Sequence, residues 1–112
     1  MTRRIALSVG DPNGIGPEIV LKALDALRGE DRLRVTVFGP PAVLERAAQA
    51  TGLASLLPEI DLRPAGELPA TAARPGEVNA PAGASAVASA TAAIEACRRG
   101  EIDAVVAGPL HE

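Results

Sequence analysis

A short apolar run that ends in a glycine-rich turn and leads into an amphipathic helix is the feature that most limits the fold of this chain. Residues 5–9 (IALSV) predict a buried strand, and residues 10–14 (GDPNG) are strong turn formers. Pro17 suits the first turn of a helix, where no amide hydrogen is needed, and Glu18 suits the positive end of the helix dipole. The pattern predicts a strand, a tight loop and a helix in succession.

The rest of the chain repeats this alternation. Strands are expected at residues 33–38, 60–62 and 102–107, a short apolar link at 53–57, and helices at 42–50 and 82–99. Residues 63–81 contain four prolines and two glycines, and we expect an irregular loop that is functional or packed by something outside the chain. Strands that alternate with helices predict an α/β fold, with a mostly parallel sheet and flanking helices.

Helical spacing also predicts which side chains are buried. The expected apolar stripes are Ile19, Val20, Ala23, Leu24 and Leu27; then Val43, Leu44, Ala47 and Ala48; and finally Val87, Thr91, Ile94 and Cys97. Cys97 is expected to be a small core residue. Phe38 is the only aromatic residue, so aliphatic side chains must supply nearly all of the buried area, at about 25 cal/mol per Å².

The composition excludes several classes of function. The net charge is −3, and the basic pairs at residues 3–4 and 98–99 are too short for a nucleic-acid-binding surface. A single cysteine excludes an internal disulfide and a multi-cysteine zinc site. The first apolar run is too short for a signal peptide, and no run reaches the length of a membrane span. We therefore expect a soluble, cytoplasmic protein with no nucleic-acid or membrane partner.

The glycine-rich loop at residues 10–18 is the first candidate binding segment. A loop between a strand end and a helix N-terminus offers backbone amides to an anion, but its spacing matches neither the dinucleotide fingerprint nor the Walker loop. The sequence does not decide whether these residues form only a tight turn or a ligand-binding loop. Asp11 fits either an Asx turn or the ligand crevice at the carboxyl end of a sheet.

The second candidate segment follows the last expected strand. His111, the only histidine, comes soon after that strand and is either a structural group or a crevice residue. The candidate residues of a substrate or cofactor cleft are Gly10, Asp11, Gly14, Gly16, Glu18, Pro109 and His111. No catalytic residue and no metal ligand is assigned, because one histidine and scattered carboxylates do not make a ligand set.

Three separated segments carry a family resemblance. Residues 5–18, 76–83 and 100–111 resemble, in order and spacing, the 4-hydroxythreonine-4-phosphate dehydrogenases of vitamin B6 biosynthesis. The resemblance implies a homodimer whose subunits have two α/β domains, as in the isocitrate and isopropylmalate dehydrogenases. It also implies oxidation of a phosphorylated 3-hydroxy acid, 4-phosphohydroxy-L-threonine, by NAD or NADP, followed by loss of CO₂. A divalent metal (Zn, Mg or Co) would be held by histidines.

Members of that family are much longer than this chain. We therefore expect residues 1–112 to be the N-terminal α/β segment of a two-domain enzyme, inactive alone, with the metal ligands and most of the catalytic remainder elsewhere. Glu112 stands where the family commonly has lysine, which would reverse a charge near the phosphate. The alternatives are a paralogue for another four-carbon sugar-acid phosphate, a non-catalytic phosphate- or nucleotide-binding module, or a piece that is stable only against a partner.

Overall fold

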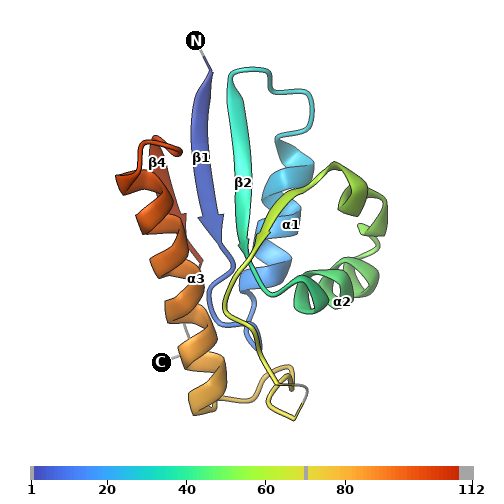
Figure 1. Cartoon of the computed structure of the whole chain (residues 1–112). Coiled ribbons are helices and arrows are strands. Elements are labelled where there is room, and N and C mark those ends of the chain that lie inside the picture. Colours follow the sequence, from blue (N-terminus) through green and yellow to red (C-terminus); the bar gives the residue numbers. More distant parts are fainter. Residues whose placement is uncertain (1, 70, 109–112) are drawn as a thin grey trace.

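Four parallel strands form a single sheet in the order β3-β2-β1-β4 (Figure 1). The structure is a computed structural model that describes residues 2–69 and 71–108. The strands are β1 (Arg3–Ser8), β2 (Leu33–Gly39), β3 (Asp61–Pro64) and β4 (Ala104–Ala107). In the central register, Leu7 lies opposite Val37 on one side and Val106 on the other. The predicted α/β class with a parallel sheet is confirmed.

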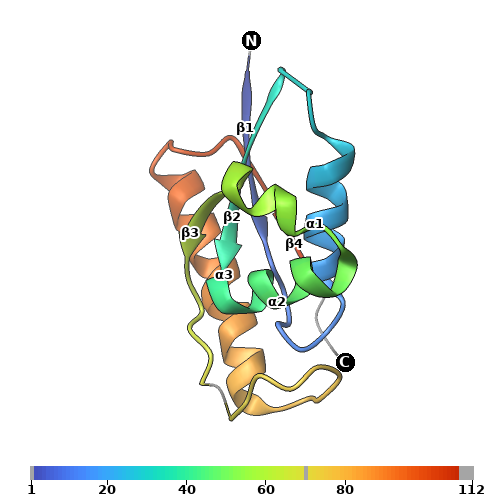
Figure 2. The ribbon, with the colours of Figure 1, turned by 90° about the vertical axis from the view of Figure 1, so that its right-hand side faces the viewer.

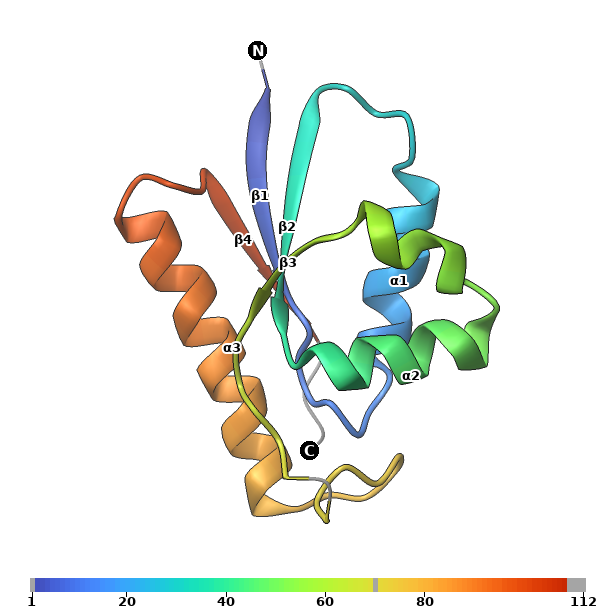
Figure 3. The ribbon, with the colours of Figure 1, turned by 45° about the vertical axis from the view of Figure 1, so that its right-hand side comes forward.

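Helices cover both faces of this sheet. The helices α1 (Gly16–Ala26) and α2 (Pro41–Thr51), with the 3₁₀ segment η1 (Ala54–Glu59), lie on one face, and α3 (Ala80–Arg98) lies on the other (Figure 3). In Figure 2, α2 and η1 lie in front of the strands. Two clusters of buried residues result: Val9, Val20, Leu21, Val37, Leu44 and Ala48 on the α1 face, and Ala6, Phe38, Ala93, Ala96 and Ile102 on the α3 face.

Three glycines crowd the backbone around Val9, the fully buried residue that follows β1. A Cβ atom on Gly16 or Gly108 would collide with the carbonyl oxygen of Val9, and a Cβ on Gly39 would collide with its side chain. The Val9 amide donates a hydrogen bond to the Phe38 carbonyl at 3.0 Å. The ends of β1, β2 and β4 and the start of α1 therefore meet at one point, which only glycine backbones can approach so closely.

The face that α3 buries differs from the prediction. Its buried residues are Ala82, Ser85, Ala86, Ser89, Ala93 and Ala96. Val87 is 61% exposed, Ile94 is 50% exposed, and Thr91 is exposed as well, so the predicted stripe is wrong for these three residues. The small side chains allow α3 to approach the sheet closely, and the larger ones lie on its other side. Cys97 is partly buried and packs against the α3-face core, in partial agreement with its expected place.

The expected stripe of α1 is correct only in part. Val20 is buried and Ala23 and Leu24 are partly buried, but Ile19 and Leu27 are exposed. Leu21, which the stripe omitted, is fully buried instead. The α2 stripe is confirmed, since Val43, Leu44 and Ala48 are buried and Ala47 is partly buried.

The last strand is shorter and more exposed than expected. β4 begins at Ala104, and its Val106 is 53% exposed, because β4 lies at the edge of the sheet that the structure describes. Ile102, which precedes the strand, is the buried residue of this segment. The apolar link at 53–57 forms the start of η1, and the third strand runs slightly beyond the expected residues 60–62.

The crowding around Val9 leads to a first prediction about stability. Gly16→Ala should destabilise the protein by about 1–3 kcal/mol or more, because the new methyl group meets a backbone oxygen that cannot move aside. Gly83→Ala is the matched control, since its Cβ meets no atom within 4 Å inside α3. That change should stabilise by about 0.5–1 kcal/mol through helix propensity. Urea unfolding of both variants gives the comparison, and equal stabilities would contradict the account of Gly16.

Candidate functional site

The 10–18 loop lies where the parallel strands end, the edge at which open α/β sheets bind ligands. Gly10 has a φ of 79°, which turns the chain away from β1. Asp11 is 4% exposed, and its Oδ1 accepts the amide of Asn13 at 2.8 Å. Its carbonyl accepts the amide of Gly14 at 3.0 Å. The structure therefore places Asp11 in an Asx turn, one of the two alternatives that the sequence left open.

The first turn of α1 completes this loop. No side chain caps the helix, because the residue before it is Ile15. The Gly16 backbone lies against Val9, and the Glu18 side chain is exposed in the first turn. Uncapped amides at a helix N-terminus are suited to a phosphate or carboxylate group.

A cavity of about 260 Å³ separates the loop from α2. Its walls are mostly apolar, and Glu18 and Arg46 are its two charged side chains; the lining comprises Pro12, Asn13, Gly14, Ile15, Pro17, Glu18, Val43, Arg46, Ala47, Ala50 and Pro75. Arg46 also donates a hydrogen bond to the Ala73 carbonyl at 3.1 Å. An apolar cavity with a few polar groups is the usual form of a small-molecule site.

The second candidate segment reaches the same edge of the sheet. The Gly108 amide donates a hydrogen bond to the Ser8 carbonyl at 2.9 Å, so the end of β4 lies beside the start of the loop. The structure therefore brings Gly10, Asp11, Gly14, Gly16 and Glu18 together in one loop near Gly108. Pro109 and His111 lie outside the described residues, and their place in a cleft stays a prediction.

The described residues do not form a binding site for a divalent metal. Residues 2–69 and 71–108 contain no group of three or more histidine, cysteine, aspartate or glutamate side chains that could hold an ion. No step of the chemistry is therefore assigned to a metal held by these side chains.

Among the helices of residues 2–69 and 71–108, none is both long and apolar enough to cross a membrane.

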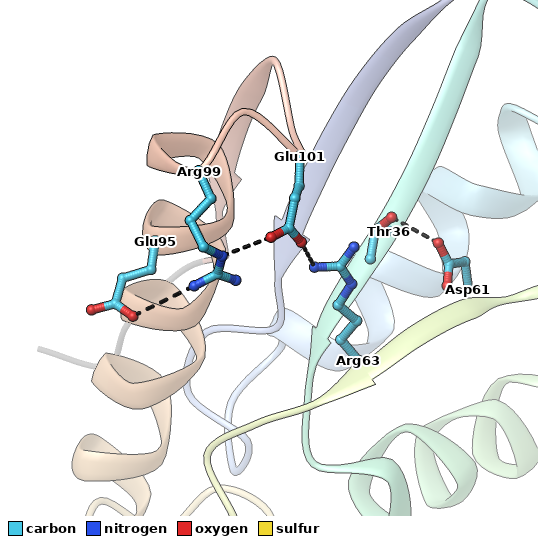
Figure 4. Close-up of polar contacts among 6 residues, drawn as sticks. All are labelled: Thr36, Asp61, Arg63, Glu95, Arg99 and Glu101. Carbon is cyan, nitrogen blue, oxygen red and sulfur yellow. Dashed lines mark hydrogen bonds and ion pairs between the residues drawn. The ribbon is translucent and has the colours of Figure 1, made fainter.

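A network of charged side chains lies on the α3 side of the sheet, toward the amino ends of the strands (Figure 4). The carboxylate of Glu101 accepts hydrogen bonds from Arg63 and Arg99, both at 2.6 Å, and Arg99 lies 4.0 Å from Glu95. The Arg63 guanidinium also lies 5.5 Å from the centre of the Phe38 ring. Glu101 therefore ties the end of α3 to β3, a link that the sequence pattern did not indicate.

These ion pairs change the acidity of two carboxyl groups. The guanidinium of Arg99, and after it that of Arg63, lowers the pKa of Glu101. In the same way, hydrogen bonds from Arg4 lower the pKa of Asp103, whose Oδ1 lies 3.1 Å from the Arg4 guanidinium. Both pairs are open to solvent, and they are expected to act as structural links that salt weakens.

Comparison with known proteins identifies the family. Residues 31–112 match the family model described as pyridoxal phosphate biosynthetic protein PdxA. The chain belongs to this family. A 4-hydroxythreonine-4-phosphate dehydrogenase from Stenotrophomonas maltophilia is 39% identical, over 100% of this chain and 36% of that protein. The resemblance stated from the sequence is therefore confirmed.

Two further comparisons give other proteins to which the chain is similar. A 1,2-dihydroxy-3,5-cyclohexadiene-1,4-dicarboxylate dehydrogenase from Comamonas sp is 53% identical, over 98% of this chain and 35% of that protein. The crystal structure of a 4-hydroxythreonine-4-phosphate dehydrogenase from Burkholderia phymatum matches with a TM-score of 0.78 and 28% identity, over 99% of this chain and 37% of that one. The chain spans about a third of the length of the curated relatives it matches.

The lowered carboxyl pKa values lead to a prediction about pH. A group whose pKa is lower when folded stabilises the protein above its unfolded pKa, about 4, and loses that contribution as the pH falls through the folded pKa. Glu101→Gln should therefore reduce stability at neutral pH and make its decline below about pH 4 shallower. Urea unfolding at several pH values is the measurement.

The control for this pH series is Glu45→Gln. Glu45 is exposed on α2, and the described residues show no ion pair for it. Its replacement should leave the pH profile unchanged. A Glu101→Gln profile that overlays the parent profile would contradict the structural role of the network.

Proposed function

We propose that this chain is the N-terminal α/β segment of a longer, two-domain dehydrogenase, and that its 10–18 loop forms one wall of the active-site cleft. The observation that carries the proposal is the position of the loop beside Gly108 at the carboxyl edge of the sheet. Membership of the PdxA family, whose named relatives are dehydrogenases, supports the reaction class. A homodimer working in the cytoplasm is part of this proposal.

The two relatives' names describe substrates with a common reactive unit. In both 4-hydroxythreonine 4-phosphate and the cyclohexadiene diol, a secondary hydroxyl lies on the carbon β to a carboxylate. Oxidation removes hydride from that carbon and the proton from its hydroxyl, and it produces a β-keto acid. The C–C bond to the carboxylate then breaks, CO₂ leaves, and the electron pair moves into the ketone as an enolate. A bound NAD or NADP would supply the hydride acceptor.

The residues of this chain would bind and position the ligand rather than carry the bond changes. The uncapped amides of α1 can bind a phosphate or carboxylate, a group that both substrates contain. Gly14 presents backbone without a side chain to the cavity, which lets a ligand approach closely. The cavity between the loop and α2 is mostly apolar, with Arg46 available for a second anionic group. Pro109 and His111 would extend the same wall from β4.

The first substrate candidate is 4-phosphohydroxy-L-threonine, in the biosynthesis of pyridoxal phosphate. The second is a dihydroxycyclohexadiene dicarboxylate, and one observation favours it: the Comamonas sp relative is 53% identical to this chain, against 39% for the Stenotrophomonas maltophilia relative. Glu112, which stands where the family commonly has lysine, also fits a substrate without phosphate better. The third substrate candidate is another four-carbon sugar-acid phosphate, which would react in the same way.

The substrate is tested with the complete protein. Each candidate is supplied with NAD or NADP and a divalent metal, and the reduced cofactor and released CO₂ are both measured. We expect equal amounts of the two products with one of the substrates and a kcat/KM at least tenfold higher than with the others. Failure to reduce either cofactor with any of these hydroxy acids would overturn the dehydrogenase proposal.

A separate prediction concerns the 112-residue chain by itself. We expect no turnover from it, because the opposite wall of the proposed cleft belongs to the longer relatives and not to these residues. The complete protein serves as the positive control under the same conditions. Turnover by the isolated chain would contradict this view, whereas calorimetric binding of NAD or phosphate without turnover would favour the alternative of a non-catalytic binding module.

A further inference from the structure

Two hydrogen bonds join the 10–18 loop to a segment about sixty residues later in the chain, and a third bond lies within that segment. The side-chain Nδ2 of Asn13 donates to the Ala72 carbonyl at 2.8 Å, and the Gly76 amide donates to the Asn13 carbonyl at 2.6 Å. The Nδ2 of Asn79 donates to the same Ala72 carbonyl at 3.1 Å. Residues 72–79 are thus held against the loop at the end of the molecule where the strands end (Figure 3).

This contact is buried at its centre. Asn13 is 2% exposed and Ala72 is 7% exposed, so water does not compete freely for their hydrogen bonds. One carbonyl oxygen has two lone pairs, and the two asparagine amides use both. The Oδ1 of Asn13 is also buried and has no partner among the described residues. The side chain of Asn13 therefore contributes through its Nδ2 donor, whose hydrogen bond to the Ala72 carbonyl is its one side-chain bond among the described residues.

The same segment is connected to two helices. The Oδ1 of Asn79 accepts the Ala82 amide at 2.8 Å and caps the start of α3. Arg46 of α2 donates to the Ala73 carbonyl, and Pro75 lines the cavity between the loop and α2. The 72–79 segment therefore contacts the 10–18 loop and α2, which border this cavity, as well as the start of α3.

We propose that Asn13 and Asn79 are positioning residues: Asn13 clamps the 72–79 segment onto the 10–18 loop, Asn79 holds the shared Ala72 carbonyl in place within that segment, and together they keep the loop in the shape that binds ligand. Neither side chain needs to touch the reacting atoms. The clamp itself follows from the contacts just described, whereas its effect on ligand binding rests on the proposed function.

The clamp is tested first without any ligand, by hydrogen exchange on the complete protein. In Asn13→Ala, exchange of the peptides that contain residues 10–18 and 72–79 should become roughly three- to tenfold faster, the effect of one lost hydrogen bond. Unchanged exchange in both peptides would overturn the proposal.

A second variant separates the clamp from the helix cap. Asn79→Asp keeps an oxygen for the Ala82 amide but removes the donor to the Ala72 carbonyl. Exchange should rise in the 72–79 peptide and stay unchanged at the start of α3. If Asn13→Ala does not fold, Asn13→Asp takes its place, because it keeps the shape of the side chain but has no donor for the Ala72 carbonyl, and equal exchange in that variant and the parent would then overturn the clamp.

Thr36→Val is the matched control. It removes a 2.8 Å hydrogen bond to Asp61 between β2 and β3, away from the loop, and it keeps the shape of the side chain. It should lower overall stability by a comparable amount without faster exchange at residues 10–18 and 72–79. A control that loosens these peptides as much as Asn13→Ala would mean that general destabilisation explains the effect, and would overturn the proposal.

Kinetics then test the link to the cleft. In Asn13→Ala and Asn79→Asp, KM for cofactor or substrate should rise several-fold while kcat changes less, and Thr36→Val should leave both unchanged. Faster exchange with unchanged KM would overturn the positioning role. If the parent oxidises none of the hydroxy acids, the proposed function fails, and the exchange experiments still decide the clamp.

Discussion

The close approach of three glycine backbones to Val9 is the constraint on which the rest of the structure depends. Any side chain at Gly16, Gly39 or Gly108 would separate β1 from its neighbours or from the start of α1. The ends of β1, β2 and β4 and the start of α1 meet around Val9. The loop after β1 therefore begins at the edge of the sheet where the parallel strands end. The start of α1 in the candidate site thus takes its position from main-chain packing, to which Gly16 contributes directly.

Much of the fold was predictable, because the signals that specify it are local. Turn formers after each apolar run and the alternation of strands with helices predicted the parallel sheet. The buried face of α3 was not predictable in this way. In an alanine-rich helix, hydrophobicity favours the face with Val87 and Ile94, whereas close packing on the sheet favours the face with Ala93 and Ser89. The exposure of β4 depends in turn on which neighbours it has, and no local pattern encodes that.

The candidate site was predictable to a similar degree. The order of the sequence indicated that the glycines and Asp11 share one loop at the end of a strand, and the structure shows Asp11 in an Asx turn there. Asn13, Arg46 and Asn79 were missed because their partners include backbone carbonyls, in one case 59 residues away, and a carbonyl has no sequence signature. The only signal was the Asn-Ala-Pro sequence that begins at Asn79, which is typical of a helix start.

The charged network around Glu101 and the loop around Gly16 lie at different ends of the sheet. Their separation gives the two regions different constraints. The ion pairs are exposed, so substitutions among these arginines and carboxylates would change how stability depends on acidity and salt without moving the backbone around Val9. A side chain at Gly16 would displace that backbone and leave the ionic links in place.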